Sequence, residues 1–138
     1  MSETAEHAII LFAHGARDER WSETLSQLRG RVQRALPNAH VSTAFLEFQS
    51  PSLVEVLGNA ERAGCTRIDV VPIFWASGGH VANDVPPLIE SFRAAHPDVQ
   101  LRLLPVISEL PGLLDFIAAA VVDAGQTSDA QRPTLDAP

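Results

Sequence analysis

Four apolar, strand-like runs alternate with four helical patterns along this chain of 138 residues. The runs are residues 8–13, 41–46, 70–75 and 99–103. Alternation of this kind is typical of βαβ units, in which successive strands are parallel and the helices cover the sheet. The sequence therefore predicts an α/β fold, a three-layer sandwich in which one four-stranded parallel sheet has helices on both faces.

The composition of the runs predicts the order of the strands. Residues 8–13 and 70–75 are almost wholly apolar, whereas residues 41–46 and 99–103 alternate more between apolar and polar side chains. A continuous apolar run is typical of a central strand, and an alternating run is typical of an edge strand. With right-handed crossovers the runs favour the order 2-1-3-4. Pro72 conflicts with this order, because proline lacks the N–H of a central strand, so we expect a bulge there or a different edge.

Helix signals lie between the runs. Ser52 with Glu55 three residues later predicts a capping box at one helix start. Pro86 favours the first turn of a third helix, for which Asn83 or Asp84 is the expected N-cap. Two further helices are indicated by apolar stripes at helical spacing. Their residues are Trp21, Leu25, Leu28, Val32 and Leu36 before Pro37, and Leu113, Leu114, Ile117 and Val121.

Length and charge limit the class of protein. We expect a single domain over residues 1–123 and a polar tail over residues 124–138, where the helical periodicity is lost. No apolar run reaches the roughly 20 residues that span a bilayer, and residues 1–6 are acidic where a secretory signal is basic, so a cytoplasmic protein is expected. The formal net charge of −7 argues against nucleic acid and anionic membranes as partners.

Two histidines follow the two continuous runs. His14 comes directly after residues 8–13, and His80 comes after residues 70–75 and a glycine-rich turn. Parallel α/β sheets bind ligands outside the carboxyl ends of their strands, and the order 2-1-3-4 makes these strands neighbours. Imidazole titrates near neutral pH and binds borderline transition metals. The pair indicates a metal or proton-transfer site, although each histidine taken alone also fits a structural role at a strand end.

Other groups at the same predicted edge extend this hypothesis. Glu47 follows the second strand, and two imidazoles with one carboxylate can hold a divalent ion with positions left open. Arg17 and Arg20 can form a local positive pocket in an acidic chain. The amides of residues 77–79 (Ser77, Gly78 and Gly79) can form an anion-binding nest. Trp75 beside them is a candidate wall for a planar ligand.

Three groups of residues, taken in order, carry a family resemblance. They are His14-Gly15-x-Arg17; Phe45-Leu46-Glu47 with Pro51-Ser52-Leu53; and Val71-Pro72-Ile73-Phe74 with Gly78-x-His80 and Asp84-Val85-Pro86. Over about residues 7–122 the chain resembles the class II tetrapyrrole chelatases, and more narrowly the short sirohydrochlorin chelatases of the CbiX/SirB type. The resemblance also implies that a proline is tolerated at position 72.

The resemblance implies a lyase that inserts Co²⁺ or Fe²⁺ into sirohydrochlorin, in cobalamin or sirohaem biosynthesis, without ATP. His14 and His80 carry over as metal-binding, proton-accepting residues, and Glu47 as the acidic residue after the second strand. Arg17, Arg20 and the amides of residues 77–79 would meet the carboxylates of the substrate. No tightly bound cofactor is expected, and the metal, Co²⁺, Fe²⁺ or Ni²⁺, is a substrate. Short chains of this type resemble one lobe that pairs as a homodimer.

Two departures and two alternatives accompany this prediction. Residues 107–109 lack the glycine that the family leads one to expect in that loop, and no histidine-rich stretch for metal storage is present. The His-Gly-x-Arg pattern also fits a histidine-dependent phosphatase, although Ala13 stands before His14 where a second cation would help. A carrier of tetrapyrrole or metal would use the same residues without catalysis.

Overall fold

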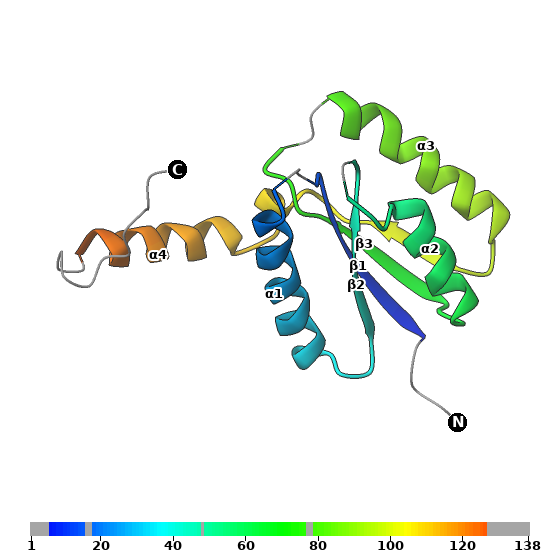
Figure 1. Cartoon of the computed structure of the whole chain (residues 1–138), viewed down its shortest axis with the longest axis horizontal. Coiled ribbons are helices and arrows are strands. Elements are labelled where there is room, and N and C mark those ends of the chain that lie inside the picture. Colours follow the sequence, from blue (N-terminus) through cyan, green and yellow to red (C-terminus); the bar gives the residue numbers. More distant parts are fainter. Residues whose placement is uncertain (1–5, 16–17, 48, 77–78, 127–138) are drawn as a thin grey trace.

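Within residues 6–15, 18–47, 49–76 and 79–126, which the computed structural model describes, strands and helices alternate along the chain (Figure 1). In chain order the elements are β1 (His7–Ala13), α1 (Arg20–Ala35), β2 (His40–Phe45), α2 (Leu53–Arg62), β3 (Arg67–Pro72), α3 (Gly79–Ala95), β4 (Gln100–Leu103), the 3₁₀ turn η1 (Ile107–Glu109) and α4 (Leu113–Gln126). The strands are parallel and form one sheet in the order β2-β1-β3-β4. The predicted α/β fold and strand order are thus confirmed.

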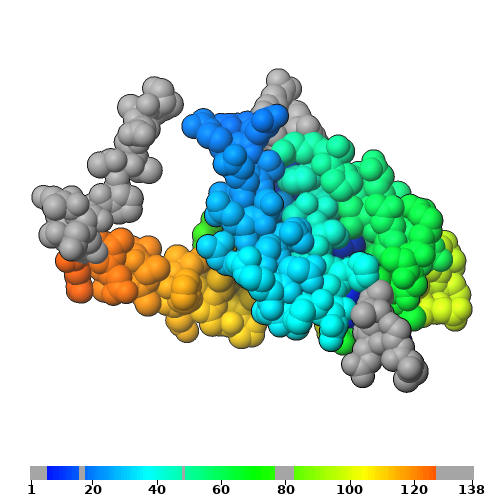
Figure 2. All heavy atoms as spheres, turned by 60° about the horizontal axis from the view of Figure 1, so that its bottom comes forward, coloured from blue at the N-terminus to red at the C-terminus, as the bar shows by residue number. Residues whose placement is uncertain are grey.

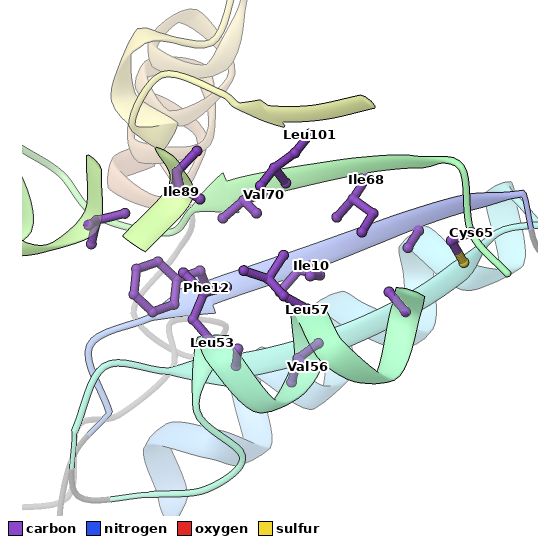
Figure 3. Packing of buried hydrophobic residues seen from close by; sticks show 14 of the residues in the cluster. Ile10, Phe12, Leu53, Val56, Leu57, Cys65, Ile68, Val70, Ile89 and Leu101 are labelled. Atoms are coloured by element: carbon purple, nitrogen blue, oxygen red, sulfur yellow. The ribbon is translucent and has the colours of Figure 1, made fainter. Parts of the chain in front are cut away.

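The first face of the sheet is covered by α2 and α3. Ile10 of β1 lies opposite Ser42 of β2 and Val70 of β3. Ile10 and Val70 are fully buried on this face, where Leu57 of α2 and Ile89 of α3 pack in the same cluster (Figure 3). Burial of one such aliphatic side chain contributes about 1.5–3 kcal/mol. This cluster fixes both helices against the two central strands.

The second face is covered by α1. Leu25, the buried residue of α1, packs with Ile9 and Leu11 of β1 and with Val41 of β2. The helix ends at Ala35, before Pro37, as its apolar stripe predicts. Helices therefore cover both faces of the sheet, and α1 lies over the β2–β1 half of its face.

Pro72 ends β3 without breaking the order of the strands. The last pair between β3 and β4 joins Val70 to Leu103, and the N–H of Leu104 donates to the carbonyl of Val70 at 2.9 Å. Neighbouring residues of a strand point their backbone groups to opposite sides, so the nitrogen of Pro72 faces the β4 side beyond this last pair. On the β1 side the N–H of Ile73 donates at 2.8 Å. Neither a bulge nor another strand order is needed.

The start of α3 differs from the sequence prediction. The helix begins at Gly79, so Pro86 and Pro87 lie inside it, and Asn83 and Asp84 are helical residues rather than N-caps. Each proline removes one backbone donor, which is why proline is usually read as a helix start. Here the helix continues through both prolines, and it packs on the sheet at both sides of them, because Val85 and Ile89 are buried in the core.

The last helix, α4, extends away from the sheet (Figures 1 and 2). It is the predicted fourth helix, but none of its side chains is buried. Residues 127–138 of the predicted tail lie outside the described residues. In the part of the chain that the structure describes, no helix is both long enough and apolar enough to cross a lipid bilayer.

Candidate functional site

The loops that follow β1 and β2 are joined at the carboxyl edge of the sheet. The N–H of Leu46 donates to the carbonyl of Ala13 at 2.9 Å, and the N–H of Glu47 donates to the carbonyl of His14 at 3.0 Å. Two successive hydrogen bonds therefore join the loops just past the ends of β1 and β2. They bring together two of the residues that the sequence predicted for the site, His14 and Glu47.

Gly15 permits this close approach. Its φ of +87° lies in the left-handed region, and a Cβ built on it would stand 2.0 Å from the carbonyl oxygen of Glu47. Real Cβ atoms cannot approach an oxygen that closely, and side chains other than glycine rarely adopt this φ. The glycine is therefore required both by the turn after His14 and by the loop that carries Glu47.

The imidazole of His14 rests on a buried aromatic ring. Its ring lies edge-to-face on Phe74, with centroids 5.0 Å apart and an interplanar angle of 72°. Phe74 in turn packs edge-to-face on Phe12 of β1 at 5.5 Å, and it is 6% exposed. His14 itself is exposed. The core thus fixes one edge of the imidazole, while the rest of the ring faces solvent, which leaves its nitrogens accessible to a ligand.

Glu47 stands on a short, closed loop. The N–H of Phe45 donates to the carbonyl of Pro51 at 2.9 Å, across the cis peptide bond between Ser50 and Pro51. Ser52 is the N-cap of α2, because its Oγ accepts from the N–H of Glu55 at 3.3 Å, which is the N-cap half of the predicted capping box. Glu47 is exposed on this loop. Its carboxylate is available to a cation that approaches the edge of the sheet.

Arg20 is already paired with an acidic neighbour. Its Nη2 lies 2.7 Å from Oδ2 of Asp18 and its Nε lies 3.2 Å from Oδ1. These hydrogen bonds lower the pKa of Asp18 to about 2 and raise the pKa of Arg20. Both side chains are solvent-exposed, so the pair is weakly held. An anionic ligand would have to compete with Asp18 for this guanidinium.

Trp75 follows β3 at the same edge and is 64% exposed. The hydroxyl of Ser108 donates to its carbonyl oxygen at 2.5 Å, which joins η1 to the loop after β3. The sequence drew attention to Ser108 only as a position without the expected glycine. In the structure Ser108 supports the backbone of Trp75 through this hydrogen bond. The two residues are far apart in the chain, so no local sequence signal predicts the contact.

The structure describes only some of the remaining predicted site residues. Arg17, Ser77 and Gly78 lie outside the described residues. Gly79 is the first residue of α3, and the backbone of His80 lies in its first turn. A helix start carries N–H groups without helical partners and a partial positive charge, so this segment suits an anion. Gly79, the residue of the predicted nest that the structure describes, thus lies at the start of a helix.

The described side chains do not form a closed metal site. Among them no three His, Cys, Asp or Glu groups converge to hold a metal ion. An exposed imidazole with a carboxylate loop beside it is an open set of weak donors, which differs from the closed four-ligand sites that retain zinc. This arrangement suits an ion that must be released again.

A second polar cluster lies on the sheet, away from this edge. Asp69 of β3, 4% exposed, accepts from His7 Nε2 at 2.8 Å and from Arg102 Nε at 2.7 Å. Burial alone would raise the pKa of Asp69, but the hydrogen bonds from Arg102 and His7 outweigh it, and the pKa is lowered. Both donors lie on strands, so this network has a structural role.

Comparison with known proteins gives a consistent picture. The family model of CbiX matches residues 8–124. The sirohydrochlorin cobaltochelatase of Methanococcoides burtonii is 29% identical over 82 residues, which cover 59% of this chain and 63% of the relative. The sirohydrochlorin cobaltochelatase of Methanocaldococcus jannaschii is 33% identical over 89 residues, which cover 64% of this chain and 62% of the relative. The match thus spans less than two thirds of the length of these relatives.

Two solved structures share the fold. A CbiX protein from Marinobacter aquaeolei VT8, named for cobalamin (vitamin B12) biosynthesis, has a TM-score of 0.75 and 37% identity, and the match covers 88% of this chain and 99% of that chain. The sirohydrochlorin chelatase SirB from Bacillus subtilis subspecies spizizenii, solved in complex with cobalt, has a TM-score of 0.68 and 22% identity. That match covers 86% of this chain but 50% of SirB.

Proposed function

We propose, from the premise that the chain belongs to the CbiX family, that this protein is a chelatase that inserts a divalent metal into sirohydrochlorin. The observation that carries the proposal is the family match over residues 8–124, which includes the exposed His14 ring, held on Phe74 at the carboxyl edge of the sheet. The names of the relatives favour Co²⁺ as the metal. Fe²⁺ and Ni²⁺ bind the same kinds of donor, so the supply of each metal in the cell can also decide which ion is inserted.

His14 and His80 act in this proposal as temporary ligands and as proton acceptors. Insertion removes two N–H protons from the macrocycle and strips water from the ion. A neutral imidazole can do both, because it coordinates borderline metals and can accept a proton. Glu47 adds a negative charge that draws the cation to the same edge. The accessible His14 ring and the open donor set support this role.

The other residues of the edge would bind the macrocycle. Its peripheral carboxylates suit Arg17 and the amides of residues 77–79, with Arg20 joining when it leaves Asp18. The exposed face of Trp75 offers a flat apolar surface for the ring. The hydrogen bond from Ser108 holds the Trp75 backbone in place.

We further propose that the working unit is a homodimer. The match with SirB covers 86% of this chain and 50% of SirB, and the His14 side of the edge is open to solvent. A macrocycle held at one open edge would leave its second face in water. A second copy can cover that face and close a cleft around the substrate.

The test follows the absorption spectrum of sirohydrochlorin with Co²⁺, Fe²⁺ or Ni²⁺. We expect catalysed insertion by the wild type and a loss of at least about a hundredfold in His14→Ala and in His80→Ala, within the range of acid–base contributions. His40→Ala is the matched control, because His40 is exposed at the amino end of β2. Multiple turnovers per protein molecule would support the assignment as an enzyme.

Three other results would overturn parts of the proposal. Stoichiometric binding of metal or sirohydrochlorin without turnover identifies a carrier. Hydrolysis of a phosphomonoester that survives a chelator and is lost in His14→Ala identifies a phosphatase. Full insertion activity in both histidine variants removes these residues from the reaction.

A further inference from the structure

β2 is the outermost strand at one end of the sheet, and several of its outward-facing backbone groups are already bonded. The N–H of Val41 donates to Oε1 of Gln33 at 3.2 Å, and the carbonyl of Val41 accepts from Nη1 of Arg29 at 3.3 Å. Four residues later, the N–H of Phe45 donates to the carbonyl of Pro51 at 2.9 Å. Side chains of α1 and the loop before α2 therefore close both ends of this strand against another chain.

Thr43 lies midway between these closed positions. Alternate residues of a strand point their backbone groups to the same side, so the N–H and the carbonyl of Thr43 face outward, as those of Val41 do. In the part of the chain that the structure describes, no hydrogen bond to either group is found. An outward N–H and carbonyl side by side are the groups to which an added strand binds. One position on the outer side of β2 thus stays open between two that are closed.

A groove of about 660 Å³ runs along this side of β2, and we call it the β2 groove. Its walls are α1, in blue, and α2, in green (Figure 2). Arg29 of α1, Thr43 of β2 and the apolar residues Val56 and Ala60 of α2 are among the residues that line it. The volume lies in the range of roughly 300–1,000 Å³ that is usual for ligand sites. Of the described lining residues none carries a carboxylate, although the chain has a formal net charge of −7.

Arg29 gives the β2 groove a positive charge. The side chain is half-buried, and its one hydrogen bond to Val41 is long. Among the described residues no carboxylate pairs with it, in contrast to Arg20, which Asp18 holds. A guanidinium has five N–H donors and binds a carboxylate through two parallel hydrogen bonds. The donors of Arg29 that Val41 leaves free can therefore bind a carboxylate that enters the groove.

The positions of Thr43 and Arg29 determine which part of a peptide fits. In an antiparallel pair, one peptide residue exchanges both hydrogen bonds with Thr43. The next peptide residue lies about 3.3 Å further, opposite Ser42, so the group that follows it comes level with Val41 and Arg29. A peptide that continued would find both backbone groups of Val41 already bonded. The β2 groove therefore suits the end of a chain and not an internal segment.

Charge also selects the direction of this chain end. An antiparallel peptide places its terminal carboxylate beside Arg29, near the amino end of β2. A parallel peptide would point the same carboxylate toward the carboxyl end of β2, where the exposed Glu47 follows the strand. Like charges repel, and only the first direction brings opposite charges together.

We propose that the β2 groove binds the carboxyl-terminal residues of a partner protein, with the penultimate residue paired to Thr43 and the terminal carboxylate on Arg29. Val41 and Phe45, which alternate with Thr43, pack on the α1 side of the sheet, so the penultimate side chain points to that side. The terminal side chain points to the α2 side, over Val56 and Ala60, and a small apolar residue fits there. This inference does not rest on the proposed function.

Peptide binding to the unmodified protein tests the proposal without any risk to its folding. The probe is a hexapeptide with a fluorophore at its amino end, threonine and valine as its last two residues and a free carboxylate, and fluorescence anisotropy follows it. We expect saturable binding. An amide in place of the carboxylate should weaken binding at least about tenfold, and an N-methyl group on the threonine about two- to tenfold. Two further residues after valine should weaken it as much as the amide does.

Hydrogen exchange locates the bound peptide. The N–H of Thr43 should exchange more slowly when the peptide saturates the protein, whereas the N–H of Ser42 points to β1 and should not change. Arg29→Ala should weaken binding at least about tenfold. Arg31→Ala is the matched control, because Arg31 is exposed on the same helix and donates to the carbonyl of Gln27 within it.

Several results would overturn the proposal. They are the absence of saturable binding, equal affinity for the acid and the amide, an unchanged exchange rate at Thr43, and equal affinity of Arg29→Ala and wild type. The assays contain neither metal nor sirohydrochlorin, so such a result leaves the chelatase assignment in place. Failure of metal insertion likewise leaves the peptide site in place.

Discussion

The backbone N–H of Glu47 donates a hydrogen bond to the carbonyl oxygen of His14, with an N···O distance of 3.0 Å. This bond joins the two loops in which the sequence predicts a base and a carboxylate. The side chains are exposed, so the backbone determines their separation. The geometry of the site therefore depends on backbone hydrogen bonds as well as on the two side chains.

Gly15→Ala tests this dependence. The new Cβ would meet the carbonyl oxygen of Glu47 and would force alanine into a φ of +87°. We expect a loss of about 2–5 kcal/mol in the free energy of unfolding, from the left-handed backbone and the contact together. Urea unfolding measures it. Gly64→Ala is the control, because Gly64 has the same φ with open space around it, and it should lose only about 1–2 kcal/mol. Equal losses would contradict the close approach.

Phe74→Leu tests whether the aromatic ring positions His14. Leucine keeps most of the apolar volume, so we expect a stability loss below about 1.5 kcal/mol, but a mobile imidazole and a fall in the rate of metal insertion. The NMR signal of the His14 ring should lose its ring-current shift. Phe92→Leu removes a similar ring from His96, with centroids 4.5 Å apart, and should leave insertion unchanged. An unaltered His14 signal in Phe74→Leu would remove the positioning role.

Asp69→Asn is expected to be destabilising at neutral pH and harmless in acid. The lowered pKa means that the folded state favours the carboxylate, so its contribution is present above the ordinary pKa of 3.8 and is lost as the pH falls through the folded value. Because the group is buried with His7 and Arg102, we expect a loss of about 3 kcal/mol at pH 7. Denaturant unfolding of both proteins from pH 3 to pH 7 measures the difference. A difference that does not shrink below about pH 4 would exclude this linkage.

Asp18→Asn is expected to release Arg20 for the substrate. Asparagine cannot neutralise the guanidinium, so the KM for sirohydrochlorin should fall about two- to fivefold, the range set by exposed ion pairs. Arg20→Ala should raise it. Steady-state kinetics at low ionic strength measure both. No change in either variant would remove Arg20 from the binding of the macrocycle, and Arg31→Ala, on the exposed side of α1, controls for the loss of one charge.

Much of the scaffold was predictable because the spacing of apolar residues along the sequence indicates which side chains are buried. The continuous runs around Ile10 and Val70 became central strands, and the strand order followed from them. The family resemblance is confirmed by the CbiX match. The start of α3 was predicted wrongly, because Pro86 has the local signature of a helix start, whereas the burial of Val85 and Ile89 keeps both sides of it helical.

The finer features of the edge could not be read from the sequence. Phe74 lies under His14, and Ser108 bonds to Trp75, through contacts between residues far apart in the chain. No local pattern encodes such pairs. Likewise, the spacing of Leu114 and Val121 predicts a helix, but an apolar stripe does not say whether its own sheet or another chain covers it.

The two prolines inside α3 have a mechanical consequence for the segment that carries His80. Pro86 and Pro87 have no N–H to offer the carbonyls of Ala82 and Asn83, so the first turns of the helix are joined to the rest by fewer hydrogen bonds. Ile89 remains seated in the core beyond this weak joint. The part of α3 beyond the prolines is therefore anchored in the core, whereas fewer backbone hydrogen bonds hold the first turns at the edge of the sheet.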